Sequence, residues 1–190
     1  MFRAVSVLFA TVALASKAYA ADIACHALER RIEAQGIALS ACKCDPSGLS
    51  APNLGQSPQM KLTAACNRRT EANGYEEGDY LFSGDLVAHG ILKWQRTTTF
   101  GDALAFDVNR SDSSRLPGLD SSFRFIGKST VLATFKPPTL SARASCWSAA
   151  ASIQVTSLYT AQDGGSDATG TYIEAFKVLR VGKYRKCKAE

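Results

Sequence analysis

The stretch YLFSGDLVAHGILKWQ, residues 80–95, decides the fold that the sequence predicts. It is longer than an average strand, and β-branched and aromatic residues of the kind enriched in strands recur along it. Gly84 and Gly90 stand inside it, where a glycine is typical of a strand that bulges or bends sharply. We therefore expect one long, bent strand here.

Downstream of this strand, five more segments have the composition or the alternation of strands. They are residues 102–109, 121–127, 129–135, 151–160 and 171–181. The last segment also fits a helix through Ile173, Phe176 and Leu179, but its threonine, tyrosine and branched residues favour a strand.

The number and spacing of these segments predict a β-rich (α+β) fold, a small five- to six-stranded antiparallel barrel or sandwich. The strand count and the glycine-bent first strand favour an OB-like barrel, the architecture named for binding oligonucleotides and oligosaccharides. That architecture hosts many functions and so indicates none by itself.

The N-terminal third differs from the rest in composition and predicts a helix and loops in place of strands. Residues 22–35 predict a helix, because Asp22 can cap its start, apolar residues recur at helical spacing and Gly36 can end it. Residues 45–60 are rich in Pro, Gly, Ser and Asn and predict a loop. We expect three regions, namely a signal peptide (1–20), a region of helix and disulfide-rich loop (21–79) and a β-rich domain (80–190).

The first twenty residues have the plan of a secretory signal peptide. Arg3 precedes an apolar run over residues 4–16, and Ala18-Tyr19-Ala20 forms a small-residue cleavage site. We expect cleavage after Ala20, no transmembrane segment in the mature chain, and a periplasmic or secreted location.

The six cysteines all follow this expected cleavage site, and an even number in an exported chain predicts a disulfide framework. They are Cys25, Cys42, Cys44, Cys66, Cys146 and Cys187. An antiparallel hairpin that pairs residue 160 with residue 171 would place Cys146 nearly opposite Cys187, so these two should form a bridge.

The cysteines of the sequence SACKCDPSG, residues 40–48, should belong to two different bridges. Cys42 and Cys44 are residues i and i+2, and in an extended chain the Cα atoms of such residues are as far apart as the upper limit for a disulfide, or farther. We expect Cys25 and Cys66 to be their partners, and which pairs with which stays open. The alternative is a metal clip with His26 as a third ligand.

No motif predicts a cofactor, a metal site or a catalytic residue. The sequence FIGKST at 125–130 ends like a phosphate-binding Walker loop, but Ser122 stands where that loop needs glycine and the residues after it are β-prone. We therefore expect a turn between two strands there. His26 and His89 are expected to be structural, and Glu76, Glu77 and Asp79 to form a solvated acidic loop.

The charge of the chain is mildly positive and unevenly distributed. A formal net charge of +5 gives no basis for expecting nucleic acid as a partner. Near the C-terminus, however, the only acid that balances the basic residues is Glu190. Arg124 lies among aromatic residues in the sequence, and aromatic rings with interleaved cations suit an anionic or sugar-bearing ligand. The candidate ligand contacts are Arg124, Lys177, Arg180, Lys183, Arg185 and Lys186.

These observations favour an exported, disulfide-stabilised protein that binds rather than catalyses. Its ligand would be an anionic envelope component or a protein partner, and an inhibitor or immunity protein fits this description. The alternative is a hydrolase of cell-wall or glycan polymers that uses Glu76 or Asp79, since such enzymes need paired carboxylates. The identity of the ligand and the oligomeric state are not predicted.

Overall fold

The computed structural model describes residues 22–33, 44, 57–70, 76–97, 101–117, 122–141, 145–162 and 170–188. Residues 22–33 form a helix, as expected from their apolar spacing. The remaining elements are β1 (Met60–Thr70), β2 (Glu76–Thr97), β3 (Gly101–Val108), α2 (Arg110–Ser113), β4 (Ser122–Phe125), α3 (Lys128–Phe135), β5 (Cys146–Gln162), β6 (Gly170–Val181) and β7 (Arg185–Lys186). The expectation of a β-rich fold with an N-terminal helix is confirmed.

Strand β2 is the long bent strand that the sequence predicts. It pairs antiparallel with β1 and β5 over its first half and with β3 and β5 over its second half. Its register against β5 shifts between Ser83 and Leu86, at Gly84. A Cβ atom at Gly84 would lie 1.8 Å from the Gln59 carbonyl oxygen, so only glycine permits this close approach.

The strand pairings connect five strands into a ring. β2 pairs with β3, β3 with β4, β4 with β6, β6 with β5, and β5 with β2 again. The β4–β6 contact is parallel and contains only two residue pairs, so the ring is closed only in part at this point. The sheet has seven strands and one parallel pair, which corrects the expected five or six antiparallel strands. The additional strands β1 and β7 come from segments that were not counted as strands.

Residues 128–135 form helix α3, so the expected strand over 129–135 and the expected turn between strands are wrong. Gly127 adopts a left-handed conformation (φ 80°) at the start of the helix. Val131 and Phe135, four residues apart, are both buried and face the core. Two prolines follow directly and prevent the helix from continuing. Tertiary packing therefore outweighs the β propensity of this segment.

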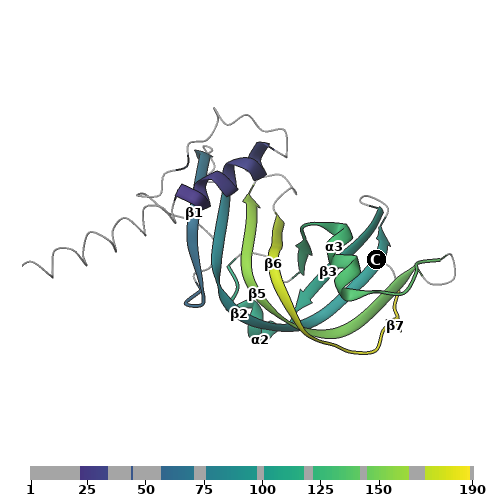
Figure 1. Cartoon of the computed structure of the whole chain (residues 1–190). Helices are drawn as coiled ribbons and strands as arrows, with labels where there is room; N and C mark the ends of the chain where they lie inside the picture. The colour runs from purple at the N-terminus through teal and green to yellow at the C-terminus, as the bar shows by residue number, and fades with distance from the viewer. Residues whose placement is uncertain are drawn as a thin grey trace, which may run out of the picture.

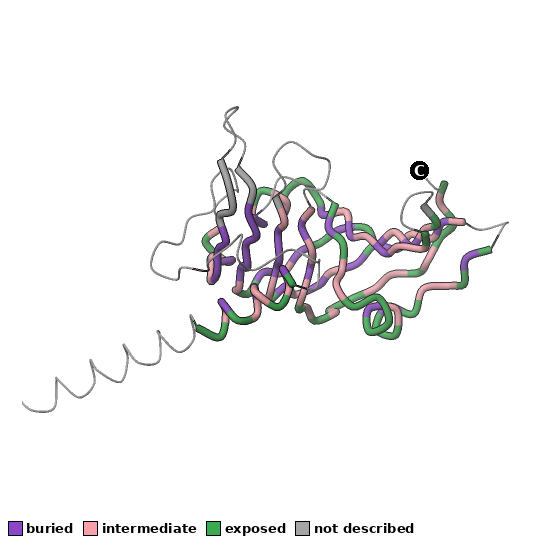
Figure 2. The backbone as a smooth tube through the Cα atoms, turned by 90° about the horizontal axis from the view of Figure 1, so that it is seen from above, coloured by how far each residue is buried: buried purple, intermediate pink, exposed green. Residues whose placement is uncertain are grey.

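The main core fills the inside of the ring and lies under α3. An aromatic group joins three elements there, since the ring of Phe125 lies 5.3 Å from that of Phe135 and 4.9 Å from that of Phe176, measured between centroids. Figure 2 shows that buried and exposed positions alternate along the strands, as in a sheet with one face turned to the core.

A second core lies on the outer face of the sheet, under the N-terminal helix. Leu28 and Ile32 of this helix are fully buried against a group that includes Leu81 and Tyr159. Figure 1 shows the helix across one end of β1, β2 and β5, and Tyr172 of β6 packs against the same cluster. The outer face at the opposite end of β2, β5 and β6 is therefore not covered by the helix.

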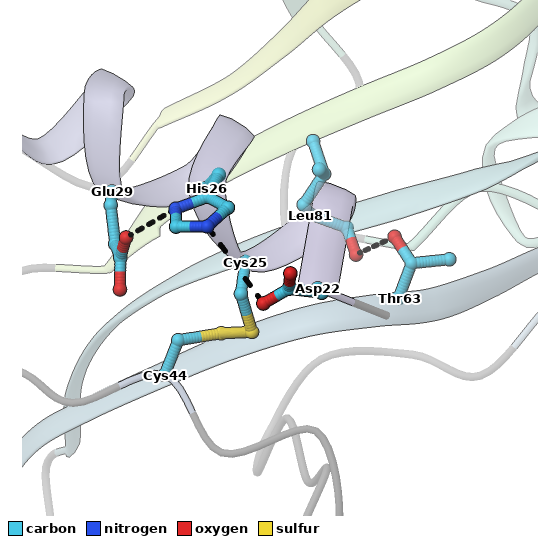
Figure 3. The surroundings of a disulfide bond; sticks show 7 residues. All are labelled: Asp22, Cys25, His26, Glu29, Cys44, Thr63 and Leu81. Atoms are coloured by element: carbon cyan, nitrogen blue, oxygen red, sulfur yellow. Dashed lines mark hydrogen bonds and ion pairs between the residues drawn. A yellow bond between two sulfur atoms is a disulfide. The ribbon is translucent and has the colours of Figure 1, made fainter. Parts of the chain in front are cut away.

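Two disulfides lie within the described residues. Cys25 is bonded to Cys44 (Figure 3), and Cys146 to Cys187. The second pairing confirms the prediction from the hairpin register, and Thr160 indeed pairs with Thr171. Cys66 is also disulfide-bonded, whereas Cys42 lies outside the described residues.

The expected signal peptide also lies outside the described residues, so its cleavage after Ala20 stays a prediction. Within the part of the chain that the structure describes, no helix combines the length and the apolar character that crossing a membrane requires. The disulfides are consistent with an exported protein.

Candidate functional site: a basic strip along β6 and β7

Six cations follow one another from the end of β6 through β7. They are Lys177, Arg180, Lys183, Arg185, Lys186 and Lys188, and we call them the basic strip. All six are exposed. Val178 and Val181 of β6 pack against the main core, which directs the neighbouring Lys177 and Arg180 side chains outward. The exposed Leu179 lies between Lys177 and Arg180.

The basic strip is not neutralised by acids of the described chain. Other cations of the protein are paired, for example Arg31 with Glu174 and Lys93 with Asp107. Among the residues that the structure describes, none of the six strip side chains forms an ion pair. The strip therefore presents positive charge on both sides of the sheet, with Lys177 and Arg180 on the outer face and Lys186 on the side of the core-packed Trp147.

Several contacts hold the strip on the body of the protein. Lys186 lies opposite Trp147 on β5, with its Nζ 6.0 Å from the centre of the indole ring. The Cys146–Cys187 bridge is one residue further along. Between β6 and β7, the Tyr184 hydroxyl donates a 3.0 Å hydrogen bond to the Phe135 carbonyl, and burial raises the pKa of this hydroxyl. The cations are thus attached to a cross-linked backbone.

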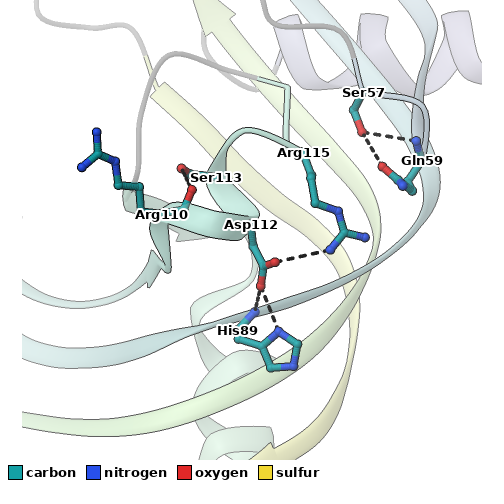
Figure 4. Close-up of polar contacts among 7 residues, drawn as sticks. All are labelled: Ser57, Gln59, His89, Arg110, Asp112, Ser113 and Arg115. Carbon is teal, nitrogen blue, oxygen red and sulfur yellow. Dashed lines mark hydrogen bonds and ion pairs between the residues drawn. The ribbon is translucent and has the colours of Figure 1, made fainter.

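His89 stands on the outer face of the sheet, two strands away from Lys177 and Arg180, the strip residues on that face. Its Nδ1 lies 2.9 Å from Oδ2 of Asp112, and its backbone N–H donates to the same oxygen at 2.9 Å. Arg115 donates to the other oxygen of Asp112 at 3.3 Å. Figure 4 shows the imidazole and the guanidinium converging on this carboxylate, while the second ring nitrogen of His89 points away from it.

The Asp112 carboxylate is held in its charged form. Burial alone would raise its pKa, but the hydrogen bonds from the backbone and the imidazole of His89, with the charge of Arg115 nearby, bring the pKa below its ordinary value. His89 is therefore structural in one sense, as expected, because its imidazole anchors α2. Its ring is nevertheless 57% exposed, so it also faces solvent.

Arg124, the remaining predicted contact residue, lies apart from the strip. It is paired with Tyr172 at the beginning of β6, about 17 Å of strand away from Lys177. Together with Phe125 and Lys128 it lines a pocket of about 160 Å³ between β3, β4 and α3. The structure thus divides the predicted contacts between two places, with Arg124 in one and the other five in the strip.

Of the two carboxylates expected for a hydrolase, the structure describes the side chain of Asp79 alone, and it is buried. Asp79 is fully buried and accepts a hydrogen bond from the Tyr159 hydroxyl beneath the N-terminal helix. Glu76 begins β2, and its side chain lies outside the described residues. Within the described part of the chain, no group of three potential metal ligands is present.

Sequence reasoning did not identify Asp112 as a partner of His89 or Trp147 as a neighbour of Lys186. Asp112 meets His89 from 23 residues away, and no motif joins them. The predicted pairing of Cys146 with Cys187 does, however, place Trp147 beside Lys186. No protein family, curated protein or solved structure matches the chain.

Proposed function

We propose that the protein is an exported binding protein that uses the basic strip to hold an anionic polymer of the cell envelope, without catalysis. The observation that carries this proposal is the set of six exposed cations with no ion pair among the described residues. Such a set gains little for stability by itself, because uncompensated like charges repel each other. An anionic ligand would supply the missing countercharges.

The strand pairing supports an OB-like barrel as the scaffold of this function. A long bent strand pairs with both halves of the sheet, the third and fifth strands of the ring (β4 and β6) are parallel, and helix α3 connects the third strand to the fourth. OB folds are partly open five-stranded barrels that bind extended polymers. The scaffold is thus compatible with an elongated ligand but does not identify it.

A polymer fits the strip better than a small ligand does. The exposed cations from Lys177 to Lys188 extend along the chain from β6 past β7. Binding to such an edge is driven by release of counterions and should weaken steeply as salt is added. An acidic protein partner, including the target of an inhibitor or immunity protein, would present similar charges.

Two matched triple variants test the proposal. Lys177→Gln, Lys183→Gln and Arg185→Gln remove three charges from the strip. Arg30→Gln, Lys61→Gln and Arg110→Gln remove three exposed charges elsewhere. At low salt we expect the strip variant to bind heparin and polyphosphate about tenfold or more weakly than wild type, and the control variant to lose about threefold or less. Equal losses in the two variants, or wild-type retention that is independent of salt, would contradict the proposal.

The same protein preparations distinguish the proposed binding function from the hydrolase alternative in an activity assay. Incubation with peptidoglycan and model glycans should release no product. Turnover that disappears in Glu76→Gln but persists in the strip variant would overturn the non-catalytic proposal, whereas polymer binding without turnover supports it.

A further inference from the structure

We propose that His89, Ser152 and Arg180 form a subsite for a phosphate group on the outer face of the sheet, and that this subsite takes up a proton with its ligand. The inference rests on the proposed function, in that it names the chemical group recognised beside the basic strip. The three residues occupy one row across β2, β5 and β6, since His89 pairs with Ser152 and Ser152 with Arg180.

The backbone of His89 shows how close its side chain lies to Ser152. Its N–H donates to Asp112 and its carbonyl accepts from the N–H of Asn109 at 2.8 Å, so both groups point away from β5. His89 and Ser152 are therefore a non-hydrogen-bonded antiparallel pair, the type in which Cα atoms approach to about 4.5 Å and side chains lie closest. Both side chains are on the outer face, because Ala88 and Ile153 beside them are buried inside.

Arg180 completes the row from the other side of Ser152. Neighbouring strands are about 4.8 Å apart, so His89 and Arg180 are separated by roughly 10 Å of backbone with the short side chain of Ser152 between them. An arginine and a histidine at this separation can both reach a ligand atom above Ser152. The serine hydroxyl can donate to it from below.

The orientation of His89 determines which charge it offers. Its Nδ1 is directed to the Asp112 carboxylate, which leaves Nε2 for the solvent side. In the neutral ring this Nε2 is an acceptor and does not favour an anion, whereas in the protonated ring it is a charged donor. Asp112 does not compete for the ligand, because both of its oxygens already accept hydrogen bonds.

The charges around His89 link protonation to ligand binding. Asp112 and Arg115 face it from α2 and the turn that follows, Arg180 faces it from β6, and Lys177 lies in the next row. Arg180 and Lys177 are like charges on neighbouring positions of one face. An anion bound between His89 and Arg180 relieves this repulsion, so that ligand and proton should bind together.

A phosphate group has the geometry that this row can recognise. An imidazolium, a hydroxyl and a guanidinium supply donors from three directions, which matches an ester phosphate with three terminal oxygens better than a planar carboxylate. Phosphate esters lose their second proton near pH 6, in the range where histidine side chains usually titrate. The expected ligand is therefore a polymer that carries phosphate groups.

Inorganic phosphate is the probe, and the two histidines of the chain provide an internal comparison. His26 pairs with Asp22 and Glu29 on the N-terminal helix, whereas His89 belongs to the row. In imidazole-detected NMR at about pH 6, phosphate should shift the His89 signals saturably and leave His26 unchanged, and at about pH 8 the saturable shift should be lost. Parallel shifts of both rings would overturn the subsite.

Arg180→Gln and Lys183→Gln are the matched variants, because each removes one strip cation but only Arg180 belongs to the row. Arg180→Gln should weaken the phosphate effect on His89 about tenfold, and Lys183→Gln less than about twofold. Ser152→Ala should weaken it by a smaller factor without removing a charge. Equal effects of the two charge variants would contradict the subsite.

The two proposals can fail separately. If heparin and polyphosphate bind the strip but phosphate does not act on His89, the subsite is wrong and the proposed function stands. If phosphate titrates His89 as described but no polymer binds at low salt, the subsite stands and the polymer proposal is wrong.

Discussion

The guanidinium of Arg31 lies 2.6 Å from Oε1 of Glu174, and this ion pair joins the N-terminal helix to β6. Both side chains are largely shielded, with 34% and 20% of their surface exposed. The other carboxylate oxygen of Glu174 accepts a 2.9 Å hydrogen bond from Ser157 on β5. One acid thus connects the helix with two neighbouring strands of the ring.

Replacing this acid tests the attachment of the helix. Glu174→Gln should lower the free energy of unfolding by about 1 to 2 kcal/mol, because a partly shielded pair loses its charge attraction while Arg31 stays in place. Urea unfolding followed by tryptophan fluorescence measures the change. Arg30→Gln, which removes an exposed neighbour of Arg31, is the control and should change stability by less than about 0.5 kcal/mol.

The apolar side of the same helix should contribute more. Leu28 is fully buried beneath it, so Leu28→Ala should cost about 2 to 5 kcal/mol through lost burial and a residual cavity. Ile23, at 52% exposure on the same helix, provides the control, and Ile23→Ala should have a small effect. Similar losses in both variants would show that the helix is not docked as described.

Removing the Cys146–Cys187 bridge should destabilise the protein and loosen the basic strip. The bridge closes a loop with a sequence separation of 41 residues, for which chain entropy gives about 3 to 4 kcal/mol. The double variant Cys146→Ala, Cys187→Ala should therefore unfold at lower urea and bind polyphosphate more weakly than wild type. A loss below about 1 kcal/mol would indicate that the contacts of Trp147 and Tyr184 alone hold β7.

Acid should destabilise the folded protein by protonating Asp112. Because its pKa is lowered in the folded protein, its stabilising contribution is complete above the ordinary aspartate value of about 3.9 and is lost as the pH falls through the folded value. Wild type should therefore lose stability more steeply than Asp112→Asn between about pH 5 and pH 2. The measurement is the urea midpoint across this range. Parallel curves would show that the carboxylate is not stabilised by His89 and Arg115.

Local patterns predicted the elements that are determined by neighbouring residues. Gly84 indicated the bend of β2, and the glycine-flanked segment after Gly170 was correctly interpreted as a strand. The hairpin register then led to the Cys146–Cys187 bridge, because a register relates residues by position alone. The six cations of the strip were visible in the sequence for the same reason.

The features that sequence reasoning missed depend on contacts between distant segments. Residues 129–135 have strand propensity, but Val131 and Phe135 form a helix because the core beside Phe176 accepts their side chains on one helical face. The parallel pairing of β4 with β6 joins two strands that are separated in the chain by α3 and the whole of β5. The contact between Asp112 and His89 depends in turn on where β3 ends, which no local pattern indicates.

The order of strands in the ring also affects the unfinished chain. β2 pairs with β1 and β3 along one edge, but its partner on the other edge, β5, comes only after α3 has been made. During synthesis or export, a chain that reaches α3 but not β5 therefore carries a long strand with one unpaired edge. Unpaired edges readily join strands of other molecules. An incompletely synthesised chain should accordingly depend on chaperones until β5 emerges, and truncations before Cys146 should aggregate rather than fold.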